Sequence, residues 1–71
     1  MYYDLVESGK RIKALRKKNG LTQEKLAEQL GIAVNTVARI EIGNRGISID
    51  LAIELAVRFN TTLDYIFLGR E

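Results

Sequence analysis

The chain has 71 residues, of which 46% are hydrophobic and 28% charged, and a formal net charge of +2, which together indicate a single globular domain over residues 1–71. It contains neither Cys nor His, so disulfides, thiolate metal sites and the commonest general base are excluded, and we expect no metal, no cofactor and no enzymatic activity. The N-terminal residues do not form a basic segment followed by a long apolar run, and no apolar run approaches the ~20 residues of a membrane helix, so we expect a cytoplasmic domain.

The first predicted helix has its apolar residues at helical spacing and ends at Gly20, which suits the left-handed conformation of a helix end. Asp4 and Glu7 form a D-x-x-E capping pattern, so the helix can begin as early as Asp4. Ser8 and Gly9 weaken the first two turns, so a later start near Ser8 is the alternative.

The second and third predicted helices are separated by a very short connection. Thr22 is the N-cap of the second helix and Gly31 ends it. The third helix runs from about Ala33 to Ile42 and is closed by Gly43.

The fourth and fifth predicted helices complete the chain. Ser48 caps the fourth helix, and Asn60, the next-best residue to Gly for a left-handed turn, ends it. Thr61 or Thr62 caps the last short helix, which ends at Gly69. With no Pro and little strand alternation, the chain is predicted to be all-α.

A helix-turn-helix pattern extends over about residues 22–42. Ala27 is small where the third helix crosses close over it, and Gly31 provides the positive φ that lets the chain turn within about three residues. Five residues with such structural roles fall at offsets 0, 4, 8, 14 and 17: Gln23, Ala27, Gly31, Val37 and Ile40.

The charges are distributed unevenly along the chain. Residues 1–20 carry six bases against two acids, residues 21–47 are neutral, and residues 48–71 carry two bases against four acids. This polarity favours one basic face for a polyanion and an opposite end that avoids it, although a solvated Lys-rich helix gives the same pattern.

The run LTQEKLAEQLGIAVNTVARIEIGNRGIS, with KRIKALRKKNG before it and TTLDYIFLGRE at the end of the chain, resembles the Cro/repressor (XRE) type of helix-turn-helix domain. The resemblance extends from about Ser8 to Leu68. It implies a compact, lambda-repressor-like bundle of five helices that binds double-stranded operator DNA as a homodimer and regulates transcription. We therefore expect a repressor of the prokaryotic or phage type, associated with the nucleoid, that acts on a near-palindromic operator and takes no small-molecule ligand.

The outward face of the third helix is the predicted reading surface. At roughly 100° per residue, Val37, Ile40 and Glu41 point inward, whereas Asn35 and Arg39 point outward. Groove chemistry pairs Asn with adenine, Arg with guanine or a phosphate, and apolar side chains with the thymine methyl group. The resemblance implies that five residues contact bases: Ala33, Val34, Asn35, Thr36 and Arg39. Groove chemistry adds Ala38, whose methyl group can meet a thymine.

The resemblance also assigns residues around the reading helix. Arg16 of the first helix and Glu41 match the positions of a structural ion pair that anchors the third helix and does not touch DNA. Five residues are expected to contact the phosphate backbone: Gln23, Asn44, Arg45, Arg11 and Lys10.

Several positions depart from the family pattern. Ala33, Val34 and Ile42 stand where the family is usually polar, so an alternative function is a protein-interaction module of the antitoxin or antirepressor type. Such a module would dock through Val34, Ala38 and Ile42. The expected dimer surface is the last helix and the loop before the fourth, with Ile47, Tyr65 and Leu68; their alternative role is closure of a small core.

Overall fold

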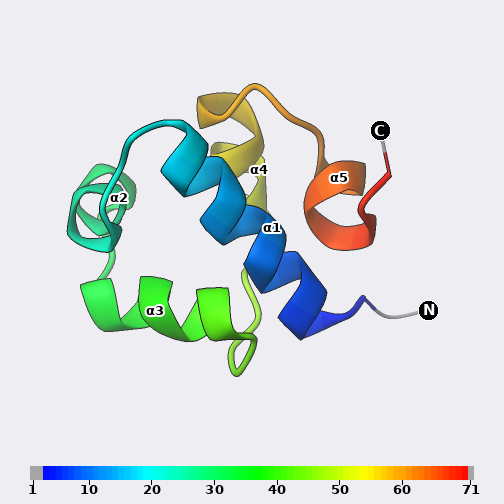
Figure 1. The fold of residues 1–71 in the computed structure, drawn as a ribbon, viewed down its shortest axis with the longest axis horizontal. Coiled ribbons are helices and arrows are strands. Elements are labelled where there is room, and N and C mark those ends of the chain that lie inside the picture. The colour runs from blue at the N-terminus through cyan, green and yellow to red at the C-terminus, as the bar shows by residue number, and fades with distance from the viewer. Residues whose placement is uncertain (1–2, 71) are drawn as a thin grey trace.

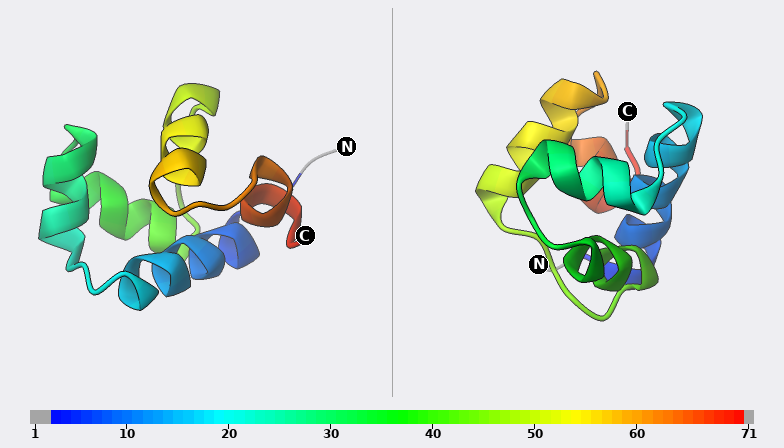
Figure 2. Two further views of the ribbon diagram at one scale, coloured as in Figure 1. Left: turned by 90° about the horizontal axis from the view of Figure 1, so that it is seen from above. Right: turned by 90° about the vertical axis from the view of Figure 1, so that its left-hand side faces the viewer.

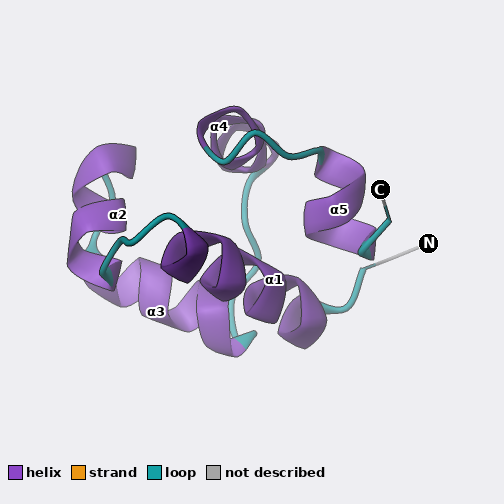
Figure 3. Cartoon of the chain, turned by 45° about the horizontal axis from the view of Figure 1, so that its top comes forward, coloured by secondary structure: helices purple, strands orange, loops and turns teal. Residues whose placement is uncertain are grey.

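The computed structural model describes residues 3–70, which form five helices joined by short loops and no strand. The helices are α1 (Leu5–Lys18), α2 (Gln23–Leu30), α3 (Val34–Ile42), α4 (Ile49–Arg58) and α5 (Leu63–Leu68). Figure 3 shows that each connection is a short loop or turn. The predicted all-α fold of five helices is therefore confirmed. Within residues 3–70, no helix is both long enough and apolar enough to cross a bilayer.

The start of α1 resolves the two alternatives for the first helix. The Asp4 carboxylate accepts hydrogen bonds from the backbone N–H groups of Val6 and Glu7, at 2.9 and 3.1 Å, so the early start is correct and the later start near Ser8 is wrong. Ser8 is buried, and its hydroxyl donates to the Ile66 carbonyl of α5 at 2.8 Å. This tertiary contact outweighs the low helix propensity of the Ser-Gly pair.

The other helix boundaries follow local signals in the sequence. The hydroxyls of Thr22, Ser48 and Thr62 each accept a backbone N–H of the first turn, at 3.0 to 3.1 Å, so Thr62 caps α5. Gly31 and Asn60 adopt φ values of +70° and +52°, which confirms the predicted left-handed turns after α2 and α4. Side-chain caps satisfy N–H groups that a helix leaves unpaired, and the left-handed residues reverse the chain.

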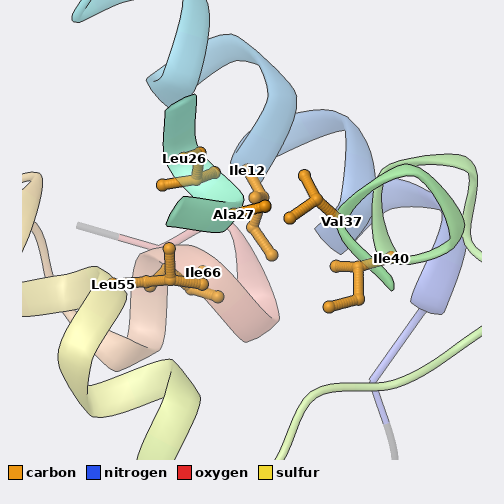
Figure 4. Packing of buried hydrophobic residues seen from close by; sticks show 7 residues of the cluster. All are labelled: Ile12, Leu26, Ala27, Val37, Ile40, Leu55 and Ile66. Carbon is orange, nitrogen blue, oxygen red and sulfur yellow. The ribbon is translucent and has the colours of Figure 1, made fainter. Parts of the chain in front are cut away.

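The core lies where all five helices meet. Figure 4 shows the side chains of this cluster converging between the helices. Every helix contributes at least one of its seven buried members: Ile12, Leu26, Ala27, Val37, Ile40, Leu55 and Ile66. Among these, α3 buries Val37 and Ile40, so the inner side of α3 is held by the core and its outer side faces away from it.

Candidate nucleic-acid interface

Helix α3 lies along one edge of the molecule, with one side packed on α1 and α2 and the other facing solvent (Figures 1 and 2). Val37, Ile40 and Glu41 are 2%, 6% and 4% exposed, so they form its inner side, as the helical spacing predicts. The turn before α3 is tight: Gly31 is left-handed, and the Ile32 N–H donates to the Ala27 carbonyl at 3.0 Å. The sharp turn after α2 thus sets the direction of α3 relative to α2.

The outer side of α3 carries the predicted base-contacting residues. Asn35, Arg39, Val34 and the N-cap residue Ala33 are exposed, whereas Thr36 and Ala38 are half-buried at the margins. Ile42, also on this side, is 66% exposed. The outer surface therefore alternates polar donors with apolar patches, which is what base edges and thymine methyl groups require of a reading helix.

The N-terminal end of α3 differs from that of the other helices. Within residues 3–70, α3 is the one helix whose N-cap residue makes no side-chain capping bond, because Ala33 has no acceptor. The N-terminal N–H groups and the helix dipole favour negative charge at this end. Replacing the usual capping hydroxyl with Ala33 thus leaves this end to solvent or to an anionic ligand.

The loop after α3 continues its exposed surface. Arg39 Nε donates to Asn44 Oδ1 at 3.3 Å, and the Asn44 N–H donates back to the Arg39 carbonyl at 3.1 Å. This exchange orients the Arg39 side chain while leaving its terminal N–H groups able to donate elsewhere. Arg45 follows Asn44 in the same exposed loop, so the chain adds a second exposed cation just after the end of α3.

A buried ion pair anchors α3 to α1. Arg16 Nε and Nη2 donate to the two carboxylate oxygens of Glu41 at 2.6 and 3.0 Å, and only 8% and 1% of the two side chains are exposed. Arg16 Nη1 also donates to the Leu21 carbonyl at 2.8 Å. The hydrogen bond that Arg16 donates to Glu41 raises the pKa of Arg16, although burial of the guanidinium opposes the change. The structure thus places both residues in the ion pair that the resemblance implied.

Gln23, the first residue of α2, belongs to the same network. Its Nε2 donates to Glu41 Oε1 at 2.9 Å, a contact that sequence reasoning missed. No local pattern signals it, because the two residues are 18 positions apart and meet only once α2 and α3 are folded together. The amide keeps one further N–H and its oxygen, so this bond is compatible with a phosphate contact but also ties Gln23 to the anchor of α3.

Residues 12–66 match the sequence profile of a family described as helix-turn-helix. The chain belongs to the Cro/repressor (XRE) type of this helix-turn-helix family. A protein named as an uncharacterised HTH-type transcriptional regulator in Archaeoglobus fulgidus is 38% identical over 61 residues, 86% of this chain and 86% of that protein. The crystal structure of the restriction-modification controller protein C.AhdI from Aeromonas hydrophila is similar with a TM-score of 0.79 and 34% identity, covering 90% of this chain and 97% of that one.

A third relative comes from a different functional class. Antitoxin PezA of Streptococcus pneumoniae is 39% identical over 54 residues, which are 76% of this chain and 34% of PezA. The same helix-turn-helix domain therefore occurs in proteins named as regulators and in a protein named as an antitoxin.

Two basic residues on α1, Lys10 and Arg11, were predicted to contact phosphate, and the structure gives them different surroundings. Arg11 Nε and Nη2 donate to the Ile66 and Phe67 carbonyls, at 3.2 and 3.0 Å. These bonds satisfy carbonyls at the C-terminal end of α5, so Arg11 is used to hold α5 on α1 and we do not retain it as a phosphate contact. Lys10 makes an exposed pair with Glu7 at 3.2 Å, which is weak enough to be exchanged for a phosphate.

The three residues predicted for the dimer surface differ in exposure. Ile47 is half-buried against the core and Tyr65 is also half-buried, whereas Leu68 is 36% exposed. Ile47 thus takes part in closing the core, the alternative role weighed for these residues. More exposed apolar side chains lie on α4, and their i, i+4, i+8 spacing in the sequence is a signal that could have identified them.

Proposed function

We propose that this helix-turn-helix protein is a sequence-specific regulator of transcription, a repressor that acts as a homodimer on a near-palindromic DNA operator. The observation that carries the proposal is the outer face of α3, which is exposed, polar in part, and held rigidly by its inner side and by the Arg16–Glu41 pair. The names of its relatives as transcriptional regulators support the same function.

In the proposed complex, α3 enters the major groove of DNA. Asn35 forms a bidentate pair with adenine N6 and N7, and Arg39 binds guanine O6 and N7 or a phosphate. Val34 and Ala38 contact thymine methyl groups, with Ala33 and Thr36 at the margins of the contact. Each subunit of the homodimer reads one half-site, with half-sites ~34–36 Å apart.

The phosphate contacts position α3 in the groove. Gln23 and the N-terminal N–H groups of α2 begin the motif, and Asn44 and Arg45 follow α3 in the chain. Lys10 adds a more distant cation. Such contacts set register and affinity without carrying sequence information.

Replacing Asn35 by alanine is expected to weaken binding to the operator by about 1–3 kcal/mol and to change binding to random DNA little, because the lost bonds go to a base edge. The operator is first selected from a random DNA pool, and dissociation constants are then measured by fluorescence anisotropy. Gln29→Ala, which removes another exposed helical amide, is the matched control. An Asn35→Ala protein that still distinguishes operator from random DNA as well as the wild type refutes this role.

The salt dependence of DNA binding gives a second prediction. The logarithm of the binding constant should fall by about 0.9 for each tenfold rise in salt and each phosphate neutralised. Arg45→Ala should lower this slope by about 1 and weaken operator and random DNA alike, since its proposed partner is a phosphate. Binding titrations at several salt concentrations measure the slope. DNA binding that is absent, or insensitive to salt, excludes the regulator function.

The second candidate function is a protein-interaction module of the antitoxin or antirepressor type. It is favoured by the exposure of Val34 and Ile42, 41% and 66%, on the same side of α3, and by the similarity to PezA. In this alternative the apolar side chains dock a protein partner. The salt titration separates the two functions, because docking through apolar side chains does not neutralise phosphates.

A further inference from the structure

Helix α4 carries an exposed apolar stripe that the proposed DNA contacts do not use. Ile49, Ile53 and Val57 are 58%, 46% and 76% exposed. They follow one another at intervals of four residues, so their side chains are neighbours along one side of the helix. The opposite side of α4 is buried through Ala52 and Leu55. We call the three residues the α4 stripe.

The α4 stripe lies apart from the reading face of α3. Figure 2 shows α4 on the side of the molecule opposite α1, whereas α3 forms a different edge. Exposed β-branched side chains in a continuous row cost free energy in water and are typical of a surface that is covered in the functional state. A partner on α4 would leave the outer face of α3 open to DNA.

We propose that the α4 stripe is the surface on which a second copy of this chain packs, with the two-fold axis beside Ile53. This inference rests on the proposed homodimer and moves its centre from Ile47, Tyr65 and Leu68 to α4. In a two-fold interface, the residue beside the axis meets its own copy. Ile53 is the middle residue of the stripe, so Ile49 and Val57 then extend the contact on either side.

The charges beside the stripe favour a second copy in the opposite orientation. Asp50 lies in the first turn of α4, Glu54 just past its middle and Arg58 at its end. If the two α4 helices ran in the same direction, Asp50 would lie against Asp50 and Arg58 against Arg58. The opposite direction sets acids near Arg58 of the second copy and opposes the two helix dipoles, so α4 is complementary to itself in charge as well as in apolar surface.

The cation at the end of the stripe is already held in place. Arg58 Nε donates to Glu54 at 2.9 Å, and its Nη2 donates to the Gln29 carbonyl of α2 at 3.0 Å. These bonds restrict the side chain before association, so little further side-chain entropy is lost when the second copy binds.

Cross-linking tests the position of the axis. The chain has no Cys, so Ile53→Cys introduces a single thiol. A short bis-maleimide should cross-link two copies of Ile53→Cys at least 10-fold faster than two copies of Leu68→Cys or of Ile42→Cys. These two variants place the thiol on the surface first expected for the dimer and on α3. Faster cross-linking at Leu68 or Ile42 than at Ile53 overturns the proposal.

Sedimentation velocity tests the energetic role of the stripe. Ile53→Glu should weaken dimerisation at least 10-fold and impair binding to the full operator while leaving binding to a single half-site intact. Ile42→Glu, the same change at an exposed position of α3, should leave dimerisation unchanged. Circular dichroism checks that each variant folds. If Ile53→Glu does not fold, the cross-linking result alone decides whether α4 forms the interface.

The outcomes distinguish this inference from the proposed function. A dimer that persists in folded Ile53→Glu overturns the α4 interface and leaves the homodimeric regulator in place. A wild-type chain that is monomeric at all concentrations, free and on the operator, overturns the homodimer and the α4 interface together.

Discussion

Replacing Glu41 by alanine is expected to lower the free energy of unfolding by about 3–5 kcal/mol, because it leaves the Arg16 guanidinium buried without its counter-charge. The carboxylate accepts two bonds from Arg16 and one from Gln23, and only 1% of the Glu41 side chain is exposed. A small domain is stable by only about 5–15 kcal/mol, so this loss removes a large part of its stability.

Urea denaturation of the wild type, Glu41→Ala and Arg16→Ala measures the effect. Glu28→Ala is the control, because Glu28 makes an exposed pair with Lys25 at 3.2 Å whose loss should cost about 0–1 kcal/mol. The double replacement Arg16→Met with Glu41→Leu should recover much of the stability, since it leaves no buried charge. A Glu41→Ala protein no less stable than Glu28→Ala would contradict this account.

The same ion pair should be insensitive to pH in the neutral range. Glu41 raises the pKa of Arg16 above its ordinary value. A raised pKa in the folded state means that the stabilisation is fully present below the unfolded pKa and is lost only as the pH rises through the folded one. Arginine already titrates in strongly alkaline solution, so the contribution of Arg16 persists throughout the neutral range.

Replacing Gly9 by leucine is expected to cost about 3 kcal/mol or more, because α1 crosses α3 at this position. A Cβ at Gly9 would lie 2.7 Å from the Glu41 carbonyl oxygen and closer still to that of Ile40. Both obstacles are backbone atoms of α3 and cannot rotate away, so the two helices must separate. Leucine is a good helix former, and the loss therefore reports the clash rather than helix propensity.

Lys13→Leu is the matched control for Gly9→Leu. It introduces the same side chain at an exposed position one turn later on α1 and should change stability by no more than about 0.5 kcal/mol. Thermal and urea unfolding compare the two proteins. Gly9→Ala should lie between them, and equal stability of Gly9→Leu and Lys13→Leu would show that α1 and α3 do not need their close approach.

Most helix boundaries and the two sides of α3 could be predicted because their causes are local. Asp4, Thr22 and Ser48 bond N–H groups two or three residues ahead, and the left-handed turn at Gly31 depends on its own backbone. The inner and outer sides of α3 follow from helical spacing alone. The Arg16–Glu41 pair, 25 positions apart, could be anticipated only from the resemblance to the family and not from any local pattern.

The remaining features depend on residues far apart in the chain. Arg11 looked like a free cation on a basic helix, and only the packing of α5 on α1 brings the Ile66 and Phe67 carbonyls to its guanidinium. Ser8 and Gly9 looked like a weak helix start. In the structure, however, Ser8 donates a hydrogen bond to α5, and Gly9 allows the backbone of α3 to approach α1 closely.

The sequence by itself determined the five helices, their caps and the helix-turn-helix motif, since each is set by hydrogen bonds or spacing within a few residues. Only the tertiary structure decided which polar side chains form hydrogen bonds within the domain and which apolar side chains remain exposed to solvent. Gln23 donates a hydrogen bond to Glu41, and the α4 stripe stays exposed. Both results depend on which side of each helix packs against its neighbours.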